Sequence, residues 1–399
     1  MERTQVTGHD GRSALRLLVA AGGTGGHLYP ALRLIEAVRA QDPHIEATLV
    51  TTDAAHDADL VRGYGPVDGV RVVSLHVRPR GSNAPAALLR FVWQLAGAWW
   101  RAMRLVIVVR PQVVVGFGSY ISAPVVLAGR LAGCRVLLHE QNVVPGQANR
   151  WLAPLAHCVA VSCPQTLQRW RGRALRVLTG NPVRPAIGAV SRPAGREAIG
   201  LTGSRRTILV LGGSRGARAL NRLMLRVVSL WSPAQRAACQ IFHLTGPDDT
   251  AMVAESYAQA GMSHRVLPFC DRMAEAYAAA DVVVARAGAT TLAELALAGR
   301  PAALIPYPYG DGHQRHNARW WVEAGAATLF DESTLTVAAV SSWLSDLLQD
   351  SARLDHMGAQ AAALAVPDAA QQLAGEVLRL AGRMPAMLPA PAVPISALA

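Results

Sequence analysis

The sequence contains no lysine, so all 39 of its basic residues are arginine. A P-loop ends in a lysine that reaches the phosphates of a bound nucleotide, and its absence argues against an ATPase of that type. No apolar run is long enough to cross a bilayer, and residues 1–14 lack the apolar centre of a secretory signal. We therefore expect a cytoplasmic protein.

Cysteine is also scarce. The five residues are Cys134, Cys158, Cys163, Cys239 and Cys270. Their number is odd and none of them shows the spacing of metal ligands, which favours buried free thiols over disulfides or a zinc site.

Acidic residues are nearly absent from one long stretch. Between residues 60 and 139, ten arginines stand against a single acid, Asp68. The same stretch carries large apolar side chains, among them Phe91, Trp93, Trp99 and Trp100. Arginine beside tryptophan favours an anionic phospholipid surface as partner, although packing in the core accounts equally well for any one of these side chains. A basic surface also suits nucleic acid, but no nucleic-acid-binding motif accompanies it, and we predict that none is bound.

Two apolar runs each end at a glycine-rich turn that opens a helix. Residues 17–21 precede Gly22-Gly23-Thr24-Gly25-Gly26-His27, and residues 208–211 precede Gly212-Gly213-Ser214-Arg215-Gly216-Ala217. Backbone N–H groups at the positive end of a helix dipole suit a phosphate. The first turn is not a dinucleotide fingerprint, because Leu28 stands at the third glycine position, which argues against a dehydrogenase.

Alternating strands and helices after each turn predict an α/β protein with two Rossmann-like domains. Their doubly wound parallel sheets would face each other across a cleft, with ligands beyond the carboxyl ends of the strands. The proline-bounded segment 180–185 marks the boundary between them. The predicted units are a flexible segment 1–14, domains at 15–184 and 185–366, a helix at 367–383 that returns toward the first domain, and a disordered tail at 384–399.

Several polar groups could carry chemistry. His27 at a helix start is a candidate general base, or a residue that only caps or packs. Thr290 and Thr291 can donate to a phosphate, while Glu294 can accept two ribose hydroxyls or cap its helix. The pair His313 and His316 has no third ligand, so we predict no metal. Asp57-Ala58-Asp59 is a DxD tripeptide, which we interpret as solvated acids on a surface helix.

Six motifs follow one another between about residue 15 and about residue 380. They are Gly22–His27, His139-Glu140-Gln141-Asn142, Gly180-Asn181-Pro182-Val183-Arg184, Gly212–Ala217 with Asn221, Arg286-Ala287-Gly288-Ala289-Thr290 with Glu294, and His313-Gln314 with Asn317-Ala318. Their order resembles that of the MurG family of bacterial N-acetylglucosaminyltransferases. The resemblance implies the GT-B fold. It also implies transfer of GlcNAc from UDP-GlcNAc to lipid I, with inversion and without a cofactor or metal.

The resemblance also implies roles for particular residues. His27 is the leading candidate for the base, and Glu140 is the second. UDP-GlcNAc would contact Thr24, Gly25, Gly26, Asn142, Arg184, Ser214, the backbone at Cys270, Ala289, Thr290, Thr291, Leu292, Ala293, Glu294, Gln314 and Asn317. Tyr120, Asn149 and Asn221 would line the acceptor cleft.

The same resemblance implies a peripheral enzyme at the cytoplasmic face of the plasma membrane, with other proteins of cell-wall synthesis as further candidate partners. Two departures from the family pattern, Ser119 in place of a second glycine and the loop Gly310–Gly312, concern the geometry around acceptor and sugar. A diacylglycerol glycosyltransferase and a non-catalytic sugar-nucleotide-binding protein remain alternative functions.

Overall fold

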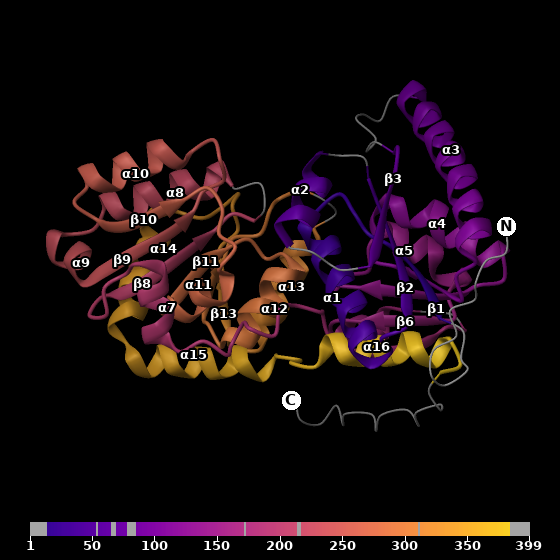
Figure 1. The fold of residues 1–399 in the computed structure, drawn as a ribbon. Coiled ribbons are helices and arrows are strands. Elements are labelled where there is room, and N and C mark those ends of the chain that lie inside the picture. Colours follow the sequence, from indigo (N-terminus) through magenta and orange to yellow (C-terminus); the bar gives the residue numbers. More distant parts are fainter. Residues whose placement is uncertain are drawn as a thin grey trace.

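A computed structural model gives the arrangement of the chain and describes residues 14–52, 55–64, 69–77, 85–170, 173–213, 217–309 and 312–383 (Figure 1). Residues 1–13 of the predicted flexible segment 1–14, and the whole predicted tail 384–399, lie outside the described residues. Two lobes stand side by side, each with a central sheet between layers of helices. The predicted fold class, two parallel-sheet α/β domains, is confirmed.

In the described residues the first lobe has a seven-stranded parallel sheet, in the order β3-β2-β1-β4-β5-β6-β7. The strands are β1 (Leu15–Ala20), β2 (Ile45–Thr52), β3 (Val70–Leu75), β4 (Val113–Gly116), β5 (Arg135–Glu140), β6 (Cys158–Val161) and β7 (Leu175–Leu178). The helices are α1 (Gly25–Gln41), α2 (Ala55–Tyr64), α3 (Pro85–Val109), α4 (Ser119–Leu131), α5 (Gln147–Leu152) and α6 (Pro164–Arg169).

The second lobe repeats this arrangement with six described parallel strands, in the order β10-β9-β8-β11-β12-β13. The strands are β8 (Arg206–Leu211), β9 (Cys239–Leu244), β10 (Ser263–Leu267), β11 (Val282–Ala285), β12 (Ala302–Leu304) and β13 (Ala327–Leu329). The helices are α7 (Arg192–Ile199), α8 (Arg218–Ser229), α9 (Pro233–Ala238), α10 (Thr250–Gln259), α11 (Met273–Ala279), α12 (Ala289–Ala298), α13 (His313–Glu323), α14 (Val337–Gln349) and α15 (Ser351–Ala363).

Helices on both faces explain why the central strands are apolar throughout. Every residue of β4 and β11 is buried, as expected for a parallel sheet covered on both sides. The strand order reverses between β1 and β4 and between β8 and β11. Ligands of such folds bind beyond the carboxyl ends of the strands at these reversals, which is where both glycine turns lie.

The last helix, α16 (Ala369–Leu380), leaves the second lobe and packs against the first. Its apolar face, with Leu373, Ala374 and Val377, joins the core that α1 forms with β1 and β4. Within the described part of the chain, no helix combines the length and the apolarity that a membrane span requires.

Candidate active site

A buried carboxylate holds the first glycine turn. Both oxygens of Asp57 accept a hydrogen bond from the Gly23 amide, at 3.1 and 3.0 Å, and Oδ2 also accepts one from the Thr52 hydroxyl at 2.6 Å. A Cβ at Gly22 would lie 2.7 Å from this oxygen, so only glycine fits there. The interpretation of Asp57 as a solvated acid is wrong: its side chain is fully buried, because α2 returns the chain to the turn.

The N-termini of two helices meet between the lobes. The Thr290 hydroxyl, in the first turn of α12, donates to the carbonyl oxygen of Gly26 in the first turn of α1, at 3.2 Å. Neither helix has an acidic residue in its first turn. The positive ends of two helix dipoles therefore face one space, an arrangement that suits a diphosphate.

A pair of asparagines joins the lobes beside this point. The Asn317 amide nitrogen donates to Asn142 Oδ1 at 3.0 Å and to the Ala287 carbonyl at 3.1 Å. Its Oδ1 accepts from the Val143 amide at 3.0 Å. The side chain of Asn317 is buried and these contacts occupy it, so it connects the lobes in this state.

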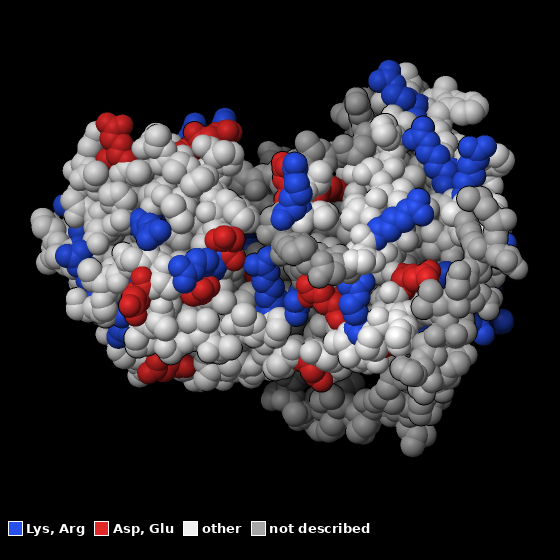
Figure 2. Space-filling model, in the orientation of Figure 1, with Lys and Arg blue, Asp and Glu red and all other residues white. Residues whose placement is uncertain are grey.

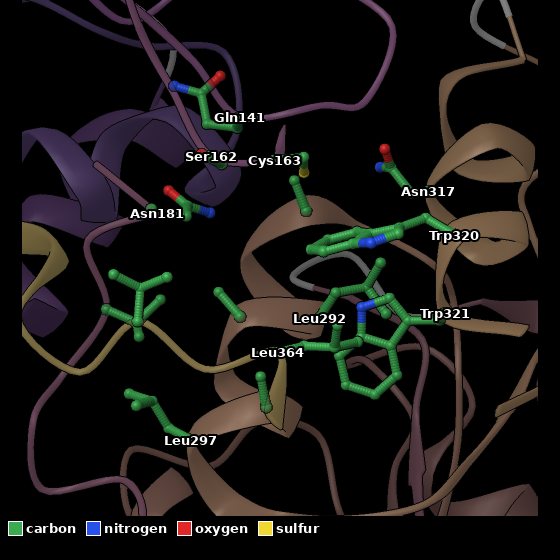
Figure 3. Close-up of a pocket in the computed structure, with 16 residues that line it drawn as sticks. Gln141, Ser162, Cys163, Asn181, Leu292, Leu297, Asn317, Trp320, Trp321 and Leu364 are labelled. Carbon is green, nitrogen blue, oxygen red and sulfur yellow. The ribbon is translucent and has the colours of Figure 1, made fainter. Parts of the chain in front are cut away.

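Behind the asparagine pair lies a cavity shared by both lobes (Figure 3). Leu292 and Ala293 of α12 line it together with Asn181 and Ser162 of the first lobe. Both polar side-chain atoms of Asn181 are buried without a hydrogen-bond partner. Buried polar groups of this kind bind ordered water where there is space for it. Because residues of both lobes line the cavity, we interpret it as part of the interface between the lobes.

His27 lies at the start of α1, beside the turn between β4 and α4. Its Cε1 is 3.5 Å from the position that a Cβ on Gly118 would take, where φ is +81°. Its Nδ1 is buried without a hydrogen-bond partner. Burial lowers the pKa of the imidazole below 6.5, and the nearby Glu140 carboxylate opposes this shift only in part. The ring is therefore neutral at pH 7 and able to accept a proton.

The Glu140 carboxylate, at the end of β5, is buried and surrounded by donors. Oε1 accepts from the backbone and side-chain nitrogens of Asn142, at 2.9 and 3.2 Å. Oε2 accepts from the Gly146 amide and from Asn149 Nδ2, both at 2.9 Å. A carboxylate with four donors is suited to hold its loop in place, which includes Asn149 next to Gly118.

Glu294, in the second turn of α12, lies where α1, α11 and the connection between the lobes meet. The Tyr277 hydroxyl donates to its Oε2 at 2.8 Å. Burial raises the pKa of Glu294 to about 7, although Tyr277 and Arg184 oppose the shift. Arg184 donates to the Asp271 carbonyl at 3.1 Å, and its guanidinium lies 5.9 Å from the Tyr29 ring.

Gln314 and Tyr120 lie near the carboxyl ends of the strands, as predicted for site residues. Gln314 Oε1 accepts a hydrogen bond from the Tyr307 amide at 3.0 Å, and the Tyr120 hydroxyl lies 4.0 Å from the position that a Cβ on Gly23 would take. Asn221 is not brought to the cleft: it is fully buried and bonded to His243, Asp249 and the Thr245 carbonyl. Ser214 lies outside the described residues.

Comparison with known proteins agrees with this geometry. Residues 17–161 match the glycosyltransferase family 28 N-terminal domain, and residues 207–373 match its C-terminal domain. The chain is similar to a UDP-N-acetylglucosamine–N-acetylmuramyl-(pentapeptide) pyrophosphoryl-undecaprenol N-acetylglucosamine transferase of Syntrophotalea carbinolica, with 38% identity over 90% of this chain and 97% of that one. A relative of the same name from Nocardioides sp. is 39% identical over 92% of this chain and 98% of its own. The chain belongs to the MurG family.

One solved structure supports the assignment to the MurG family, and another shares the fold. The crystal structure of Acinetobacter baumannii MurG has a TM-score of 0.71 and 29% identity, with 92% of this chain and 99% of that chain covered. A UDP-N-acetylglucosamine 2-epimerase has a TM-score of 0.63 at 15% identity, with coverage of 93% and 98%. At that identity the second likeness concerns the fold alone.

Three residues of this MurG-family site were missed from the sequence. Asp57 holds the glycine turn, and Tyr277 and Tyr29 surround Glu294. A signal existed only for Asp57, since an acid a few residues after a buried strand commonly lies at the carboxyl edge of the sheet. The two tyrosines lie on helices whose orientation the sequence did not reveal.

Helix α3 exposes part of the predicted aromatic surface. Trp93 is 71% exposed and Trp100 is 57% exposed, whereas Trp99 packs toward the core and Phe91 contacts the Tyr120 ring edge-on. The sequence also missed Trp151, which is 83% exposed. Figure 2 shows basic side chains and no acidic ones where α3 crosses this face.

Proposed function

We propose that this protein transfers N-acetylglucosamine from UDP-N-acetylglucosamine to the C4 hydroxyl of undecaprenyl-diphospho-N-acetylmuramoyl-pentapeptide, lipid I, and so produces lipid II with inversion at the anomeric carbon. The observation that carries the proposal is the meeting of two helix N-termini in one cleft, in a chain of the MurG family. The donor diphosphate would lie against α12 and the acceptor diphosphate against α1.

The residues around this space then have distinct tasks. Charge that develops on the leaving UDP would be stabilised by the helix N-termini and by Arg184. Glu294 would accept hydrogen bonds from the ribose hydroxyls, and Gln314 would contact the GlcNAc group. His27 would take the proton of the attacking C4 hydroxyl. Asn142 and Asn317 hold the lobes together, so a direct contact of either with the sugar would require that this pair separates.

The test of the function is a transfer reaction. Labelled UDP-GlcNAc and a soluble lipid I analogue are incubated with the protein, and β1,4-linked product and released UDP are quantified. We expect both in equal amounts. Donor binding without product would support a sugar-nucleotide-binding protein, and product formed only with diacylglycerol would support a different lipid glycosyltransferase.

The ionisation of Glu294 should appear in donor affinity. A ribose diol donates to the charged carboxylate, so binding favours the ionised form and the donor affinity should rise as the pH passes through about 7. If only the ionised form binds, the affinity increases about tenfold between pH 6 and pH 8. Calorimetric titration with UDP-GlcNAc measures this, because its diphosphate diester does not titrate in that range.

Glu294→Gln is the matched control for this step. It preserves the size of the side chain and removes the charge, so the rise in affinity should disappear. A pH step of the same size in Glu294→Gln would assign it to another group. The free energy of unfolding of the unliganded protein should fall over the range in which donor affinity rises. Because the pKa of Glu294 is raised from 4.5 in the folded state, the contribution of Glu294 to stability is complete below pH 4.5 and is lost as the pH approaches 7.

We further propose that α3 is the surface through which the enzyme contacts the membrane. Trp93 and Trp100 are seven residues apart and therefore share one side of the helix. Arg104 lies 5.7 Å above the Trp100 ring, and Arg90 and Arg101 are exposed on the same helix. Indole rings beside guanidinium groups suit the headgroup region of an anionic bilayer.

A double variant tests this surface. We expect Trp93→Ser with Trp100→Ser to weaken binding to anionic vesicles about 30-fold, since the lost burial is worth about 2 kcal/mol. Co-sedimentation measures it, and UDP-GlcNAc affinity should be unchanged. Leu230→Ser, an exposed apolar residue of the second lobe, is the control. Unchanged vesicle binding in the double variant, or binding that ignores lipid charge and salt, would contradict the proposal.

A further inference from the structure

A separate cavity lies in the second lobe, at the amino ends of the strands, opposite to the end that carries the glycine turn. It has a volume of about 300 Å³. Its walls come from α7, α15, the first residue of β8 and the turn between α12 and β12. The strands begin here, whereas the proposed donor site lies where they end, so the two spaces are on opposite sides of the lobe.

Arginine side chains gather around one buried carboxylate at this cavity. Asp281 Oδ1 accepts from Arg192 at 2.8 Å and from Arg206 at 3.2 Å. Its Oδ2 accepts from Arg196 at 2.7 Å and from the Thr207 amide at 2.7 Å. The Asp281 side chain is only 1% exposed. Its hydrogen-bonding capacity is therefore used within the protein.

A fourth guanidinium, that of Arg300, adds charge that Asp281 compensates only in part. Arg300 lines the cavity and donates from Nη2 to the Ala278 carbonyl at 3.1 Å, while its Nε is buried without a hydrogen-bond partner. Burial, followed by repulsion from Arg192, lowers the pKa of Arg300 to about 10. This is what a cation without enough negative charge around it shows.

The charges can be compared directly. Three arginines, Arg192, Arg206 and Arg300, line the cavity together with Asp281 and Asp355, while Arg196 binds Asp281 from outside this lining. The lining itself therefore carries one positive charge in excess, and Arg196 behind Asp281 raises the excess of the whole cluster to two. Leu354, Pro301 and Ala362 form an apolar part of the wall, beside which a carbon skeleton can pack.

We propose that this cavity binds a dianionic phosphate group, either inorganic phosphate or the phosphate of a small phosphomonoester. Guanidinium groups bind phosphate oxygens through paired hydrogen bonds, and two negative charges match the excess. Helix α12 extends from Glu294 at the donor site to the turn at Gly299 and Arg300 beside the cavity. The occupant would thus lie at the far end of a helix that also contacts the nucleotide.

Titration with inorganic phosphate at pH 8 and constant ionic strength tests the proposal. It is performed on the full chain, alone and with saturating UDP to occupy the donor site. We expect one phosphate to bind regardless of UDP. Arg300→Gln and Arg192→Gln should each weaken this binding at least tenfold, because each removes a charge-assisted hydrogen bond. Arg226→Gln, an exposed arginine of α8, should leave it unchanged.

Melting temperatures without phosphate show whether the variants fold. Arg192 is 39% exposed, so its replacement should preserve the fold even if that of Arg300 does not. Wild-type protein that binds no phosphate in the presence of UDP, or binding that both variants retain, overturns the proposal. Failure of UDP to bind would count against the proposed function only, because the arginine variants still test this cavity. A glycerol phosphate titration distinguishes a phosphomonoester site from one that takes free phosphate alone.

Discussion

Replacement of His27 by alanine is expected to lower kcat about 10²- to 10⁴-fold, the usual contribution of a general base. The affinity for UDP-GlcNAc should remain within about threefold, and the melting temperature should hardly change. The physical reason is the position of the ring at the first turn of α1, next to the space where two helix N-termini meet. Its Nδ1 has no hydrogen-bond partner in the described part of the protein, while the ring also interacts with Gln141 and the Phe117 backbone, so the melting temperature is measured beside kcat.

The pH profile separates this role from that of Glu294. Because the pKa of His27 is lowered below 6.5, the neutral base is present at pH 7 and is lost only under more acidic conditions. Wild-type kcat should therefore rise with pH up to that pKa and remain level above it. The step near pH 7 that belongs to Glu294 should appear in donor affinity, whereas the step in kcat should be absent from His27→Ala.

His44→Ala is the control for this experiment. His44 is exposed in the turn between α1 and β2, away from the cleft, and its loss should leave both kcat and the pH profile as they are. Turnover by His27→Ala close to that of wild-type protein would remove His27 as the base. Loss of donor binding together with activity would instead make it a residue that shapes the cleft.

The sequence predicted the fold because its signals are local. An apolar run that stops at glycines and continues as a helix predicts a strand, a turn and a helix N-terminus wherever it occurs. The burial of Asp57 is different in kind. An acid shortly after a strand indicates only a position near the carboxyl ends of the strands. The burial of Asp57 also depends on contact with Gly23, 34 residues away, and on the direction in which α2 returns, which no local pattern records.

The direction in which each helix face points accounts for the other differences between the predicted and the observed positions of residues. Asn221 follows the second glycine turn, but the face of α8 that carries it lies against β9, where His243 binds its Oδ1 at 3.0 Å. On α3, the buried residues Ala98, Ala102 and Val106 repeat every four positions. This spacing places Trp99 beside the buried face of the helix and Trp93 and Trp100 on the opposite face.

Glu140→Gln should destabilise the protein by about 3 kcal/mol and lower its melting temperature by about 6 to 12 °C. The carboxylate accepts four hydrogen bonds inside the first lobe. A glutamine has only one acceptor oxygen, and its NH₂ group would face donors. At least one of the buried N–H groups of Asn142, Gly146 or Asn149 would then lose its partner.

A positioning role predicts that activity and stability fall together in this variant. The loop that Glu140 holds carries Asn142, which binds Asn317 of the other lobe, and Asn149, which lies beside Gly118 and His27. Loosening it should raise the dissociation constant of UDP-GlcNAc as well as lower kcat, whereas the exposed Glu46→Gln should change neither. A large loss of kcat at unchanged melting temperature and unchanged donor affinity would identify Glu140 as the proton acceptor, because only a group that acts on the reacting hydroxyl would affect turnover alone.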